Sequence, residues 1–241
     1  MLEKTKGIVL QQIKYTDSGI VVHLFTRSFG RRSFILKGVR NKKCGKHNVF
    51  FQPLFLLDLV FYNKESRSMP VIKEFSVSYA PGDIYSNARK SCMALFMSEV
   101  MSAVLKEESP NENLFDFLAN AIIYFDESGN SFVNFHISFL SGLSSYLGFQ
   151  PALKRSARDV FFDMINGTFT SVPPLHGNYA GEEVSAILSA FFSSSYDKAS
   201  DISLNGRMRN EVLETIIRYY SLHLPGLKRI NSLRVLKEVF S

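Results

Sequence analysis

The sequence predicts an α+β fold, in which a small closed barrel of five strands is followed by an all-helical domain. Two observations predict it. Short β-branched and aromatic runs alternate with turn residues over residues 1–80, and apolar residues recur at helical spacing from residue 81 onward. Charge divides in the same place, because residues 1–80 hold 14 Lys and Arg against 5 Asp and Glu, and the remainder holds 14 against 17. We therefore predict two domains, residues 1–80 and residues 81–241.

The barrel prediction depends on five runs with strand character, each ended by a polar or glycine-containing turn. They lie at residues 7–13, 20–26, 32–39, 52–62 and 69–79. Closing five short strands into a barrel removes exposed sheet edges. A five-stranded barrel of this kind is the OB architecture, whose exposed face and loops bind oligonucleotides through stacking and charge.

Helical periodicity begins after the Ala-Pro-Gly-Asp sequence at residues 80–83, which can act as a linker and a helix cap. The predicted helices span residues 84–105, 114–125, 132–147, 182–192, 207–222 and 232–239. The interval between the third and fourth helices is punctuated by Asn166-Gly167 and Pro173-Pro174. We predict a short irregular or hairpin insertion there, around residues 152–180.

Composition and motifs argue against several classes of protein. Cys44 and Cys92 are the only cysteines, which disfavours a disulfide framework and a zinc site, so we expect no metal. No apolar run is long enough to span a membrane, so we expect a cytoplasmic protein. The five histidines are scattered, and no HExxH, GxSxG, Walker A or GxGxxG pattern occurs. We therefore expect neither an enzyme nor a cofactor.

The strongest signal of function is a basic segment at residues 27–46, which contains eight basic residues and no acidic one. A stretch of one charge sign repels itself unless it faces a polyanion, so we predict a nucleic-acid site. Another polyanion, an acidic protein or a merely solvated face are the alternatives. Phe29, at a turn, is the best candidate for stacking on a base. The predicted site consists of Arg27, Phe29, Arg31, Arg32, Lys37, Arg40, Lys42, Lys43 and Lys46.

Replacing four of these residues by alanine is expected to weaken DNA binding without loss of thermal stability. The four are Arg31, Arg32, Lys42 and Lys43.

A second basic patch contains Lys154, Arg155 and Arg158. Asp159 or Asp163 could neutralise it, so function and solvation both remain open for this patch.

Several stretches, in the same order from about residue 4 to residue 240, resemble the RecO family of bacterial recombination mediators. In the first domain they are TKGIVL at 5–10, KYTDS at 14–18, LFTRSFGR at 24–31, LKGVR at 36–40 and QPL at 52–54. In the second they are FLSGL at 139–143, LGFQP at 147–151, YYSLHLPG at 219–226 and SLRVLKEVF at 232–240.

The resemblance implies an OB domain followed by a helical domain in a nucleoid-associated protein. It implies binding of single- and double-stranded DNA, annealing of complementary strands, and loading of RecA onto DNA coated by single-stranded DNA-binding protein (SSB). RecR and the acidic C-terminal tail of SSB are the implied partners, with RecA an indirect one. The tail would bind a groove in the helical domain, for which Arg155 and Arg229 are candidates.

One departure from the family is visible. Many members carry a four-cysteine zinc module after the Gly-Phe-Gln-Pro sequence, whereas residues 152–206 here contain no cysteine. We expect the module to be absent and the segment to be held by ordinary packing. Two other functions remain open from the residues alone, an OB-fold RNA-binding protein and a non-catalytic adaptor for acidic protein tails.

Overall fold

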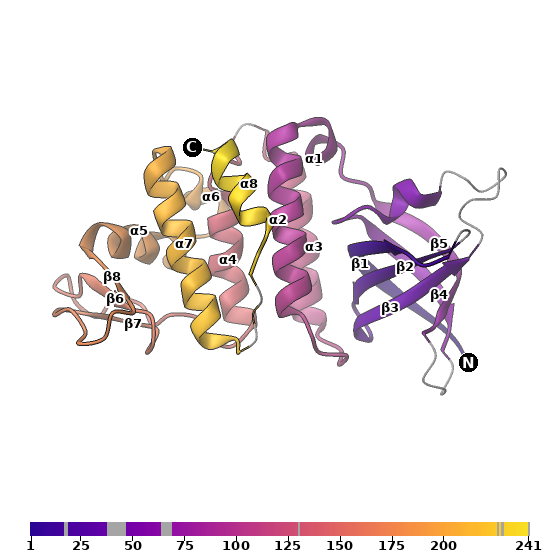
Figure 1. Cartoon of the computed structure of the whole chain (residues 1–241), viewed down its shortest axis with the longest axis horizontal. Helices are drawn as coiled ribbons and strands as arrows, with labels where there is room; N and C mark the ends of the chain where they lie inside the picture. Colours follow the sequence, from indigo (N-terminus) through magenta and orange to yellow (C-terminus); the bar gives the residue numbers. More distant parts are fainter. Residues whose placement is uncertain are drawn as a thin grey trace. The chain divides into compact units, whose positions relative to one another are not determined.

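The computed structural model of the chain describes residues 1–16, 19–37, 47–63, 69–129, 131–225, 227 and 229–240. Their contacts form two compact units, residues 1–127 and residues 128–241. Within the described residues, the first unit contains five strands, a short 3-10 helix at His47–Phe51 and three α-helices, and the later helices belong to the second unit (Figure 1). The predicted mixed fold, with an N-terminal five-stranded sheet and helices later in the chain, is confirmed. The boundary predicted at residue 80 falls where strands change to helices, whereas the contacts group the first three helices with the sheet.

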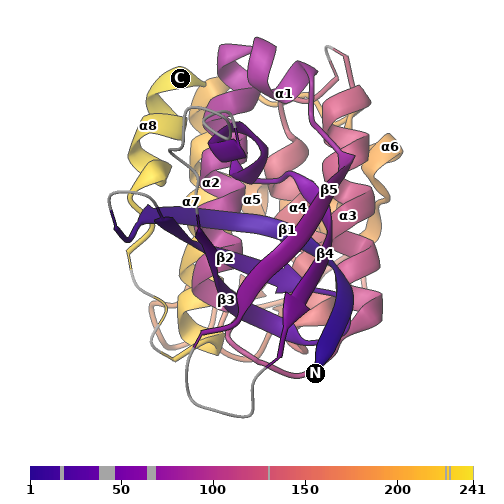
Figure 2. The same cartoon turned by 90° about the vertical axis from the view of Figure 1, so that its right-hand side faces the viewer.

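Five strands of the first unit form a closed barrel (Figure 2). They are β1 (Leu2–Lys14), β2 (Gly19–Thr26), β3 (Gly30–Lys37), β4 (Leu56–Tyr62) and β5 (Val71–Tyr79). Their order is β1-β2-β3-β5-β4, and β4 pairs again with β1. The pairing is antiparallel except between β3 and β5, which meet in parallel at Ile35 and Val71.

Strand β1 closes the barrel because it is long enough to pair on both sides. Its first half pairs with β4 and its second half with β2, and Gly7 and Ile8 pair on both sides. A bulge between Val9 and Gln11, just beyond these two residues, bends the strand. At the bend, the Val9 carbonyl accepts from the Leu54 amide, and the Val9 amide donates to Phe55. Leu54 has a left-handed backbone, φ 66°, so the strand predicted at residues 52–62 begins only at Leu56.

The barrel interior is filled by alternate residues of the five strands, as period-two alternation requires. Its buried members include Val22 and Leu24 of β2, Phe34 of β3, and Leu59 and Phe61 of β4. Phe34 and Phe61 meet edge to face, with ring centroids 5.0 Å apart. Phe34 is therefore a core residue, and only side chains of the opposite parity point out of the barrel.

Helices α1 (Asp83–Ser86), α2 (Ala88–Val104) and α3 (Glu112–Glu127) complete the first unit. The prediction of a single helix at residues 84–105 is wrong in one respect, because the helix is interrupted at Asn87. Asn87 has an extended backbone, and its side chain accepts hydrogen bonds from the amides of Arg89 and Lys90. Asparagine competes for backbone hydrogen bonds in this way, which makes it a good helix cap and a poor interior residue.

The junction between the barrel and these helices is held by the buried carboxylate of Asp126 at the end of α3. It accepts from the Tyr79 hydroxyl at 2.8 Å, the Gly82 amide at 3.0 Å and the Ile84 amide at 2.7 Å. The fully buried ammonium of Lys90 donates to the carbonyls of Phe125 and Asp126. These bonds fix the segment between β5 and α2 against the C-terminal end of α3.

The outer surface of β1 and β2 packs against the helices at one end of the barrel. Ser98 of α2 donates to the Leu10 carbonyl, and the ring of Phe25 stacks on Phe115 of α3 with centroids 6.4 Å apart. The turn between β2 and β3 fits closely against the segment after α2. Gly30 has φ 62°, and a Cβ there would lie 2.4 Å from the Ser109 carbonyl, so only glycine fits.

The second unit is built around α4 (Phe135–Tyr146), which packs against α5 (Glu182–Ser193), α6 (Tyr196–Ala199) and α7 (Gly206–His223). The Tyr220 hydroxyl of α7 donates to the Leu140 carbonyl of α4 at 2.6 Å. A last helix, α8, spans Ser232–Val239.

A single buried guanidinium, that of Arg209 in α7, connects three separate segments of this unit. It donates to the Asn134 side chain at 2.9 Å, to the Leu204 carbonyl at 2.7 Å and to the Phe240 carbonyl at 3.2 Å. Burial lowers the pKa of Arg209 from its ordinary value. These hydrogen bonds to the charged group offset part of the cost of removing it from water.

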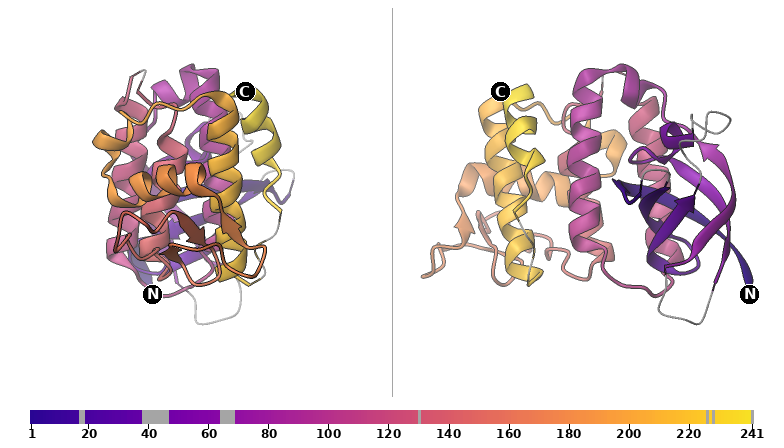
Figure 3. Two further views of the ribbon diagram at one scale, coloured as in Figure 1. Left: turned by 90° about the vertical axis from the view of Figure 1, so that its left-hand side faces the viewer. Right: turned by 45° about the vertical axis from the view of Figure 1, so that its right-hand side comes forward.

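The hairpin predicted within residues 152–180 forms part of a small sheet (Figure 3). Its strands are β6 (Phe161–Asp163), β7 (Thr168–Thr170) and β8 (Tyr179–Ala180), in the order β7-β6-β8. Phe162 packs this sheet against Phe192 and Tyr219. In the part of the chain that the structure describes, no three His, Cys, Asp or Glu side chains come together as metal ligands.

Candidate nucleic-acid interface

The basic segment runs from the end of β2, through the turn at residues 27–29, along β3. The structure places Arg27, Arg31, Arg32 and Lys37, whereas Arg40, Lys42, Lys43 and Lys46 lie outside the described residues. Side chains alternate along β3, so Arg31 and Lys37 point outward, while Arg32 has the parity of the core residue Phe34. The four described cations therefore do not form one continuous surface.

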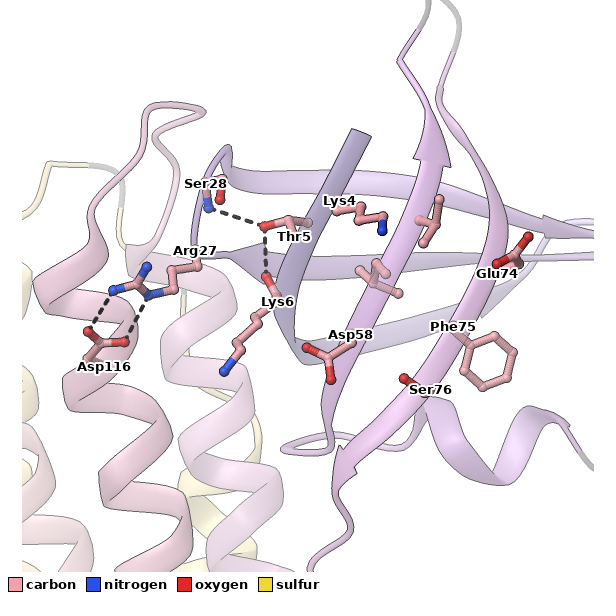
Figure 4. A pocket seen from close by; sticks show the side chains of 12 residues that line it. Lys4, Thr5, Lys6, Arg27, Ser28, Asp58, Glu74, Phe75, Ser76 and Asp116 are labelled. Atoms are coloured by element: carbon pink, nitrogen blue, oxygen red, sulfur yellow. Dashed lines mark hydrogen bonds and ion pairs between the residues drawn. The ribbon is translucent and has the colours of Figure 1, made fainter. Parts of the chain in front are cut away.

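Arg27 is already compensated by acidic residues of α3. Its guanidinium lies 2.8 Å from the Glu112 carboxylate. It also lies 3.1 Å from the carboxylate of Asp116, a pair that Figure 4 shows. The hydrogen bond from Arg27 lowers the pKa of Asp116, and the same bond raises that of Arg27. Both partners are accordingly charged at neutral pH. Because the two carboxylates neutralise the charge of Arg27, this residue is a poor candidate for binding a phosphate.

Arg31 has a structural role at the end of α2. Its guanidinium donates to the carbonyls of Ser102 at 2.5 Å and Leu105 at 3.0 Å, which are left without helical partners where α2 ends. A cation there also interacts favourably with the negative end of the helix dipole. Its backbone amide donates to the Glu107 carbonyl.

Replacing Arg31 by alanine should therefore destabilise the protein, by about 2 kcal/mol for two lost hydrogen bonds to a charged donor. The variant in which Arg31, Arg32, Lys42 and Lys43 are all replaced by alanine contains this substitution, so we now expect it to lose thermal stability as well. Thermal unfolding of Arg31→Ala measures the effect, with Lys37→Ala as the matched control from the same strand. Equal melting temperatures for the two variants would contradict the structural role.

The side chains of Arg32 and Phe29 contact each other in a cation–π interaction. The guanidinium of Arg32 lies 5.0 Å from the centroid of the Phe29 ring and donates to the Asn63 side chain. The same ring meets Phe61 edge to face, with centroids 5.4 Å apart. Phe29 is therefore packed on the barrel core, and one face of its ring is already taken by a cation.

Lys37 is exposed at the end of β3 and makes no ion pair within the described residues. It is the one described cation of the segment that is free to meet a phosphate, and the remaining four lie in the stretch that follows it.

A shallow pocket of about 720 Å³ lies on the outer face of β1, β4 and β5 (Figure 4). Three cations line it, Lys4, Lys6 and Arg27, and three anions oppose them, Asp58, Glu74 and Asp116. The register places Lys6 directly opposite Asp58. Because its charges balance, this pocket is a poor phosphate site.

In the described structure, the arginines of the second basic patch are not neutralised by the acidic residues near them in the sequence. Asp159 accepts hydrogen bonds from the backbone amides of Arg155 and Ser156, and Asp163 accepts from Ile165 and Asn166. Neither carboxylate forms an ion pair with the arginines in the described structure. Arg155 and Arg158 are exposed, while Lys154 lies 5.4 Å from the ring of Phe169.

A groove between α7 and α8, with a volume of about 770 Å³, joins apolar and basic side chains. Ile217, Leu227, Ile230 and Leu233 supply the apolar part of its lining. Arg229, Arg234 and Lys237 outnumber the one acidic residue, Glu238. Lys237 is paired with Glu214, and Arg234 is 3.8 Å from Glu238, whereas Arg229 forms no ion pair in the described structure. Of the two residues suggested for tail binding, Arg229 lies in this groove and Arg155 does not line it.

The groove could not be found from the sequence, although its helices could be. Residues 232–239 show an apolar stripe with basic residues beside it, which is typical of a helix that buries one side. Which second helix completes the groove depends on tertiary packing. No helix of the described chain is both long and apolar enough to cross a membrane.

The chain is similar to known proteins over its whole length. The family model described as Recombination protein O N terminal matches residues 1–80, and the one described as Recombination protein O C terminal matches residues 85–234. DNA repair protein RecO of Bacteroides fragilis is 38% identical over 242 residues, and that of Phocaeicola vulgatus 35% over 241 residues, with both chains fully covered in each case. The RecO of Flavobacterium psychrophilum is 32% identical over 240 residues, covering 99% of each chain.

Proposed function

The chain belongs to the RecO family of DNA repair proteins, and from this premise we propose that it is a DNA-binding recombination mediator. It binds single- and double-stranded DNA, anneals complementary strands and promotes loading of RecA onto SSB-coated DNA. RecR and the SSB tail are its proposed partners, with RecA an indirect one. It works without catalysis, in the cytoplasm and close to the nucleoid.

We assign residues 1–80 to an OB fold that serves as the DNA-binding domain, and residues 81–241 to a helical domain. The strand order β1-β2-β3-β5-β4 and a bent β1 shared by two ladders support this assignment. In such barrels, the face formed by β2 and β3 and the loops after β1 and β4 bind oligonucleotides.

The observation that carries the proposal is the segment of eight cations without an acidic residue, from Arg27 to Lys46. Arg27, Arg31 and Arg32 support the fold, so the phosphate contacts are assigned to Lys37, Arg40, Lys42, Lys43 and Lys46. Neutralising phosphates releases counterions and reduces repulsion between two strands. Base edges stay free in this arrangement, which favours annealing. Arg155 and Arg158 form a second, smaller phosphate site.

Fluorescence anisotropy of a labelled single-stranded oligonucleotide at several salt concentrations tests the proposal. We expect binding whose affinity falls steeply with salt. Competition by RNA of the same sequence separates a DNA-binding protein from an RNA-binding one. Absence of oligonucleotide binding at low salt, together with binding of acidic peptides, would favour an adaptor for acidic protein tails.

The α7–α8 groove is the proposed site for the SSB tail. A peptide with acidic residues and an apolar end fits a groove whose floor is apolar and whose rim is basic.

Replacing Arg229 and Arg234 by glutamate should weaken binding of a labelled tail peptide about tenfold or more, because two attractive charges become repulsive. Arg207→Glu, on an exposed residue of α7 outside the groove, is the matched control. Equal affinities in the two variants would place the tail elsewhere.

A further inference from the structure

The segment between β7 and β8 holds the two most exposed large apolar side chains among the described residues of the second unit. Leu175 is fully exposed and Val172 is 68% exposed, and Pro173 and Pro174 lie between them. We call residues 172–175 the apolar loop. Single apolar side chains in water are common on folded proteins, whereas a contiguous group of them marks a binding site.

The apolar loop is anchored at both ends. At its start, the Thr170 hydroxyl donates to the Val172 carbonyl at 2.8 Å. Directly after it, the His176 ring nitrogen Nε2 lies 3.3 Å from the carboxylate of Asp163, which is buried at the end of β6. The two prolines fix φ within the loop. These constraints reduce the number of conformations open to the loop and keep Leu175 in solvent.

The stretch before β6 brings Arg155 to the end of β7 from which the apolar loop leaves. The Ala152 amide donates to the Gly167 carbonyl at 2.8 Å, and the Lys154 ammonium lies 5.4 Å from the centroid of the Phe169 ring. These two contacts place the stretch alongside β7, running in the same direction. Arg155 is the next residue, so it lies beside the last residues of β7.

Arg158 comes to the same end of the small sheet from β6. It precedes Phe161 by three residues, and Phe161 pairs with Thr170, the last residue of β7. Continuing this antiparallel register beyond the pair brings Val172 level with the residue after Arg158. Leu175 is three residues further along, and three residues span at most about 11 Å. The two arginines and the apolar loop therefore share one end of the sheet.

The arginines beside the loop form no ion pair within the described residues. Residues 152–180 contain three cations and two carboxylates. Asp159 accepts hydrogen bonds from the backbone amides of Arg155 and Ser156. Asp163 is engaged by His176 and by amides of the turn between β6 and β7. Both guanidinium groups are thus available to an anion next to the apolar loop.

A partner for this end of the sheet must present anionic groups and apolar surfaces close together. Duplex DNA has this chemistry, because flat base pairs lie between two phosphate backbones. Proteins that kink a duplex insert Leu, Ile, Met, Phe or Pro between base steps, and they hold the backbone with Arg or Lys. A projecting loop of one valine, two prolines and one leucine beside two arginines matches this arrangement. A protein pocket with an acidic rim offers similar chemistry, and the experiment below separates it from DNA.

We propose that Leu175 inserts between neighbouring base pairs of duplex DNA, while Arg155 and Arg158 bind the phosphates beside the opened step. The proposal rests on the DNA-binding function proposed above, in which the two arginines form a second phosphate site, and it adds a contact to bases. Opening a base step costs least where the pairing is imperfect. The inserted leucine therefore favours mismatched duplexes, which arise while two strands anneal.

The test compares the full-length protein with Leu175→Ala and with the double variant Val172→Ala/Leu175→Ala. Anisotropy measures binding to three labelled DNAs of equal length: a perfect duplex, a duplex with one central mismatch, and a single strand. The wild type should bind the mismatched duplex about tenfold more tightly than the perfect one, and both variants should reduce this preference below about twofold. Affinity for the single strand should stay within about twofold of the wild type, because a single strand offers no paired step to open.

The matched control is Ile165→Ala, which removes a 43% exposed apolar side chain from the turn at the opposite end of the hairpin. It should keep the mismatch preference of the wild type. The double variant Arg155→Gln/Arg158→Gln should weaken binding of both duplexes by a similar factor, because phosphates flank either kind of step. All these side chains are exposed, so every variant should keep the wild-type melting temperature.

A mismatched duplex that contains 2-aminopurine beside the mismatch gives a second readout, because unstacking raises the fluorescence of this base. The wild type should raise it and Leu175→Ala should not. A wild type without mismatch preference, or an equal preference in wild type and Leu175→Ala, would overturn the inference while leaving the DNA-binding function intact. The apolar loop would then be assigned to an acidic-rimmed protein pocket. Absence of wild-type binding to all three DNAs would overturn the proposed function and this inference with it.

Discussion

Replacing Lys37, Arg40, Lys42, Lys43 and Lys46 together by glutamine is expected to weaken binding of single-stranded DNA by about two orders of magnitude at 0.2 M salt. Each phosphate contact on a single strand contributes about 0.7 to the slope of log affinity against log salt. Losing five contacts should therefore lower that slope by about 3.5, and the loss of affinity should grow as salt is reduced. Anisotropy titrations across a range of salt concentrations measure both quantities.

Arg27→Gln is the control for this variant, because it removes a charge of the same segment that Glu112 and Asp116 already compensate. We expect its salt slope to stay close to that of the wild type. If the five-residue variant keeps the wild-type slope, the phosphate site lies elsewhere, and Arg155 and Arg158 become the first residues to replace.

Replacing Asp126 by alanine is expected to lower the free energy of unfolding by about 3 kcal/mol. The substitution leaves the Ile84 and Gly82 amides and the Tyr79 hydroxyl without their acceptor, and a buried donor left unpaired costs about 1–3 kcal/mol. For a chain of this size, the change corresponds to a fall in melting temperature of about 6–12 °C. Thermal or chemical unfolding of the purified variant measures it.

Two variants sharpen the Asp126 experiment. Asp126→Asn retains one acceptor oxygen and should lose less stability than the alanine variant. Glu127→Ala removes the neighbouring carboxylate, which is exposed, and should unfold like the wild type. Equal stability of Asp126→Ala and Glu127→Ala would show that the carboxylate does not hold the junction.

The strands and most helices could be predicted because their signals are local. Alternation and turn residues specify the five strands, and apolar residues at helical spacing specify the helices. Breaks that depend on one residue were harder to predict. Asn87 divides a continuous apolar pattern through a side-chain cap, and Leu54 delays β4 through a left-handed backbone that the bend of β1 stabilises.

The candidate site could be predicted as a segment but not residue by residue. Arg27, Arg31 and Arg32 are alike in composition, yet one pairs with α3, one caps α2 and one lies over Phe29. These roles follow from register and from the placement of helices far along the chain. Alternation alone could not show whether Phe25 and Phe34 point into or out of the barrel. The strand register places Phe34 in the core and Phe25 on the outer surface, where Phe115 of α3 covers it.

The hydrogen bonds of Arg209 have a consequence for synthesis of the chain. All residues of the first unit have been made once residue 127 has left the ribosome, so that unit can fold while the remainder is still being translated. The guanidinium of Arg209 finds its last acceptor only at the Phe240 carbonyl. The second unit therefore gains this last hydrogen bond only after residue 240 has emerged. Premature termination shortly before that residue would leave a folded first unit attached to a second unit that lacks this hydrogen bond.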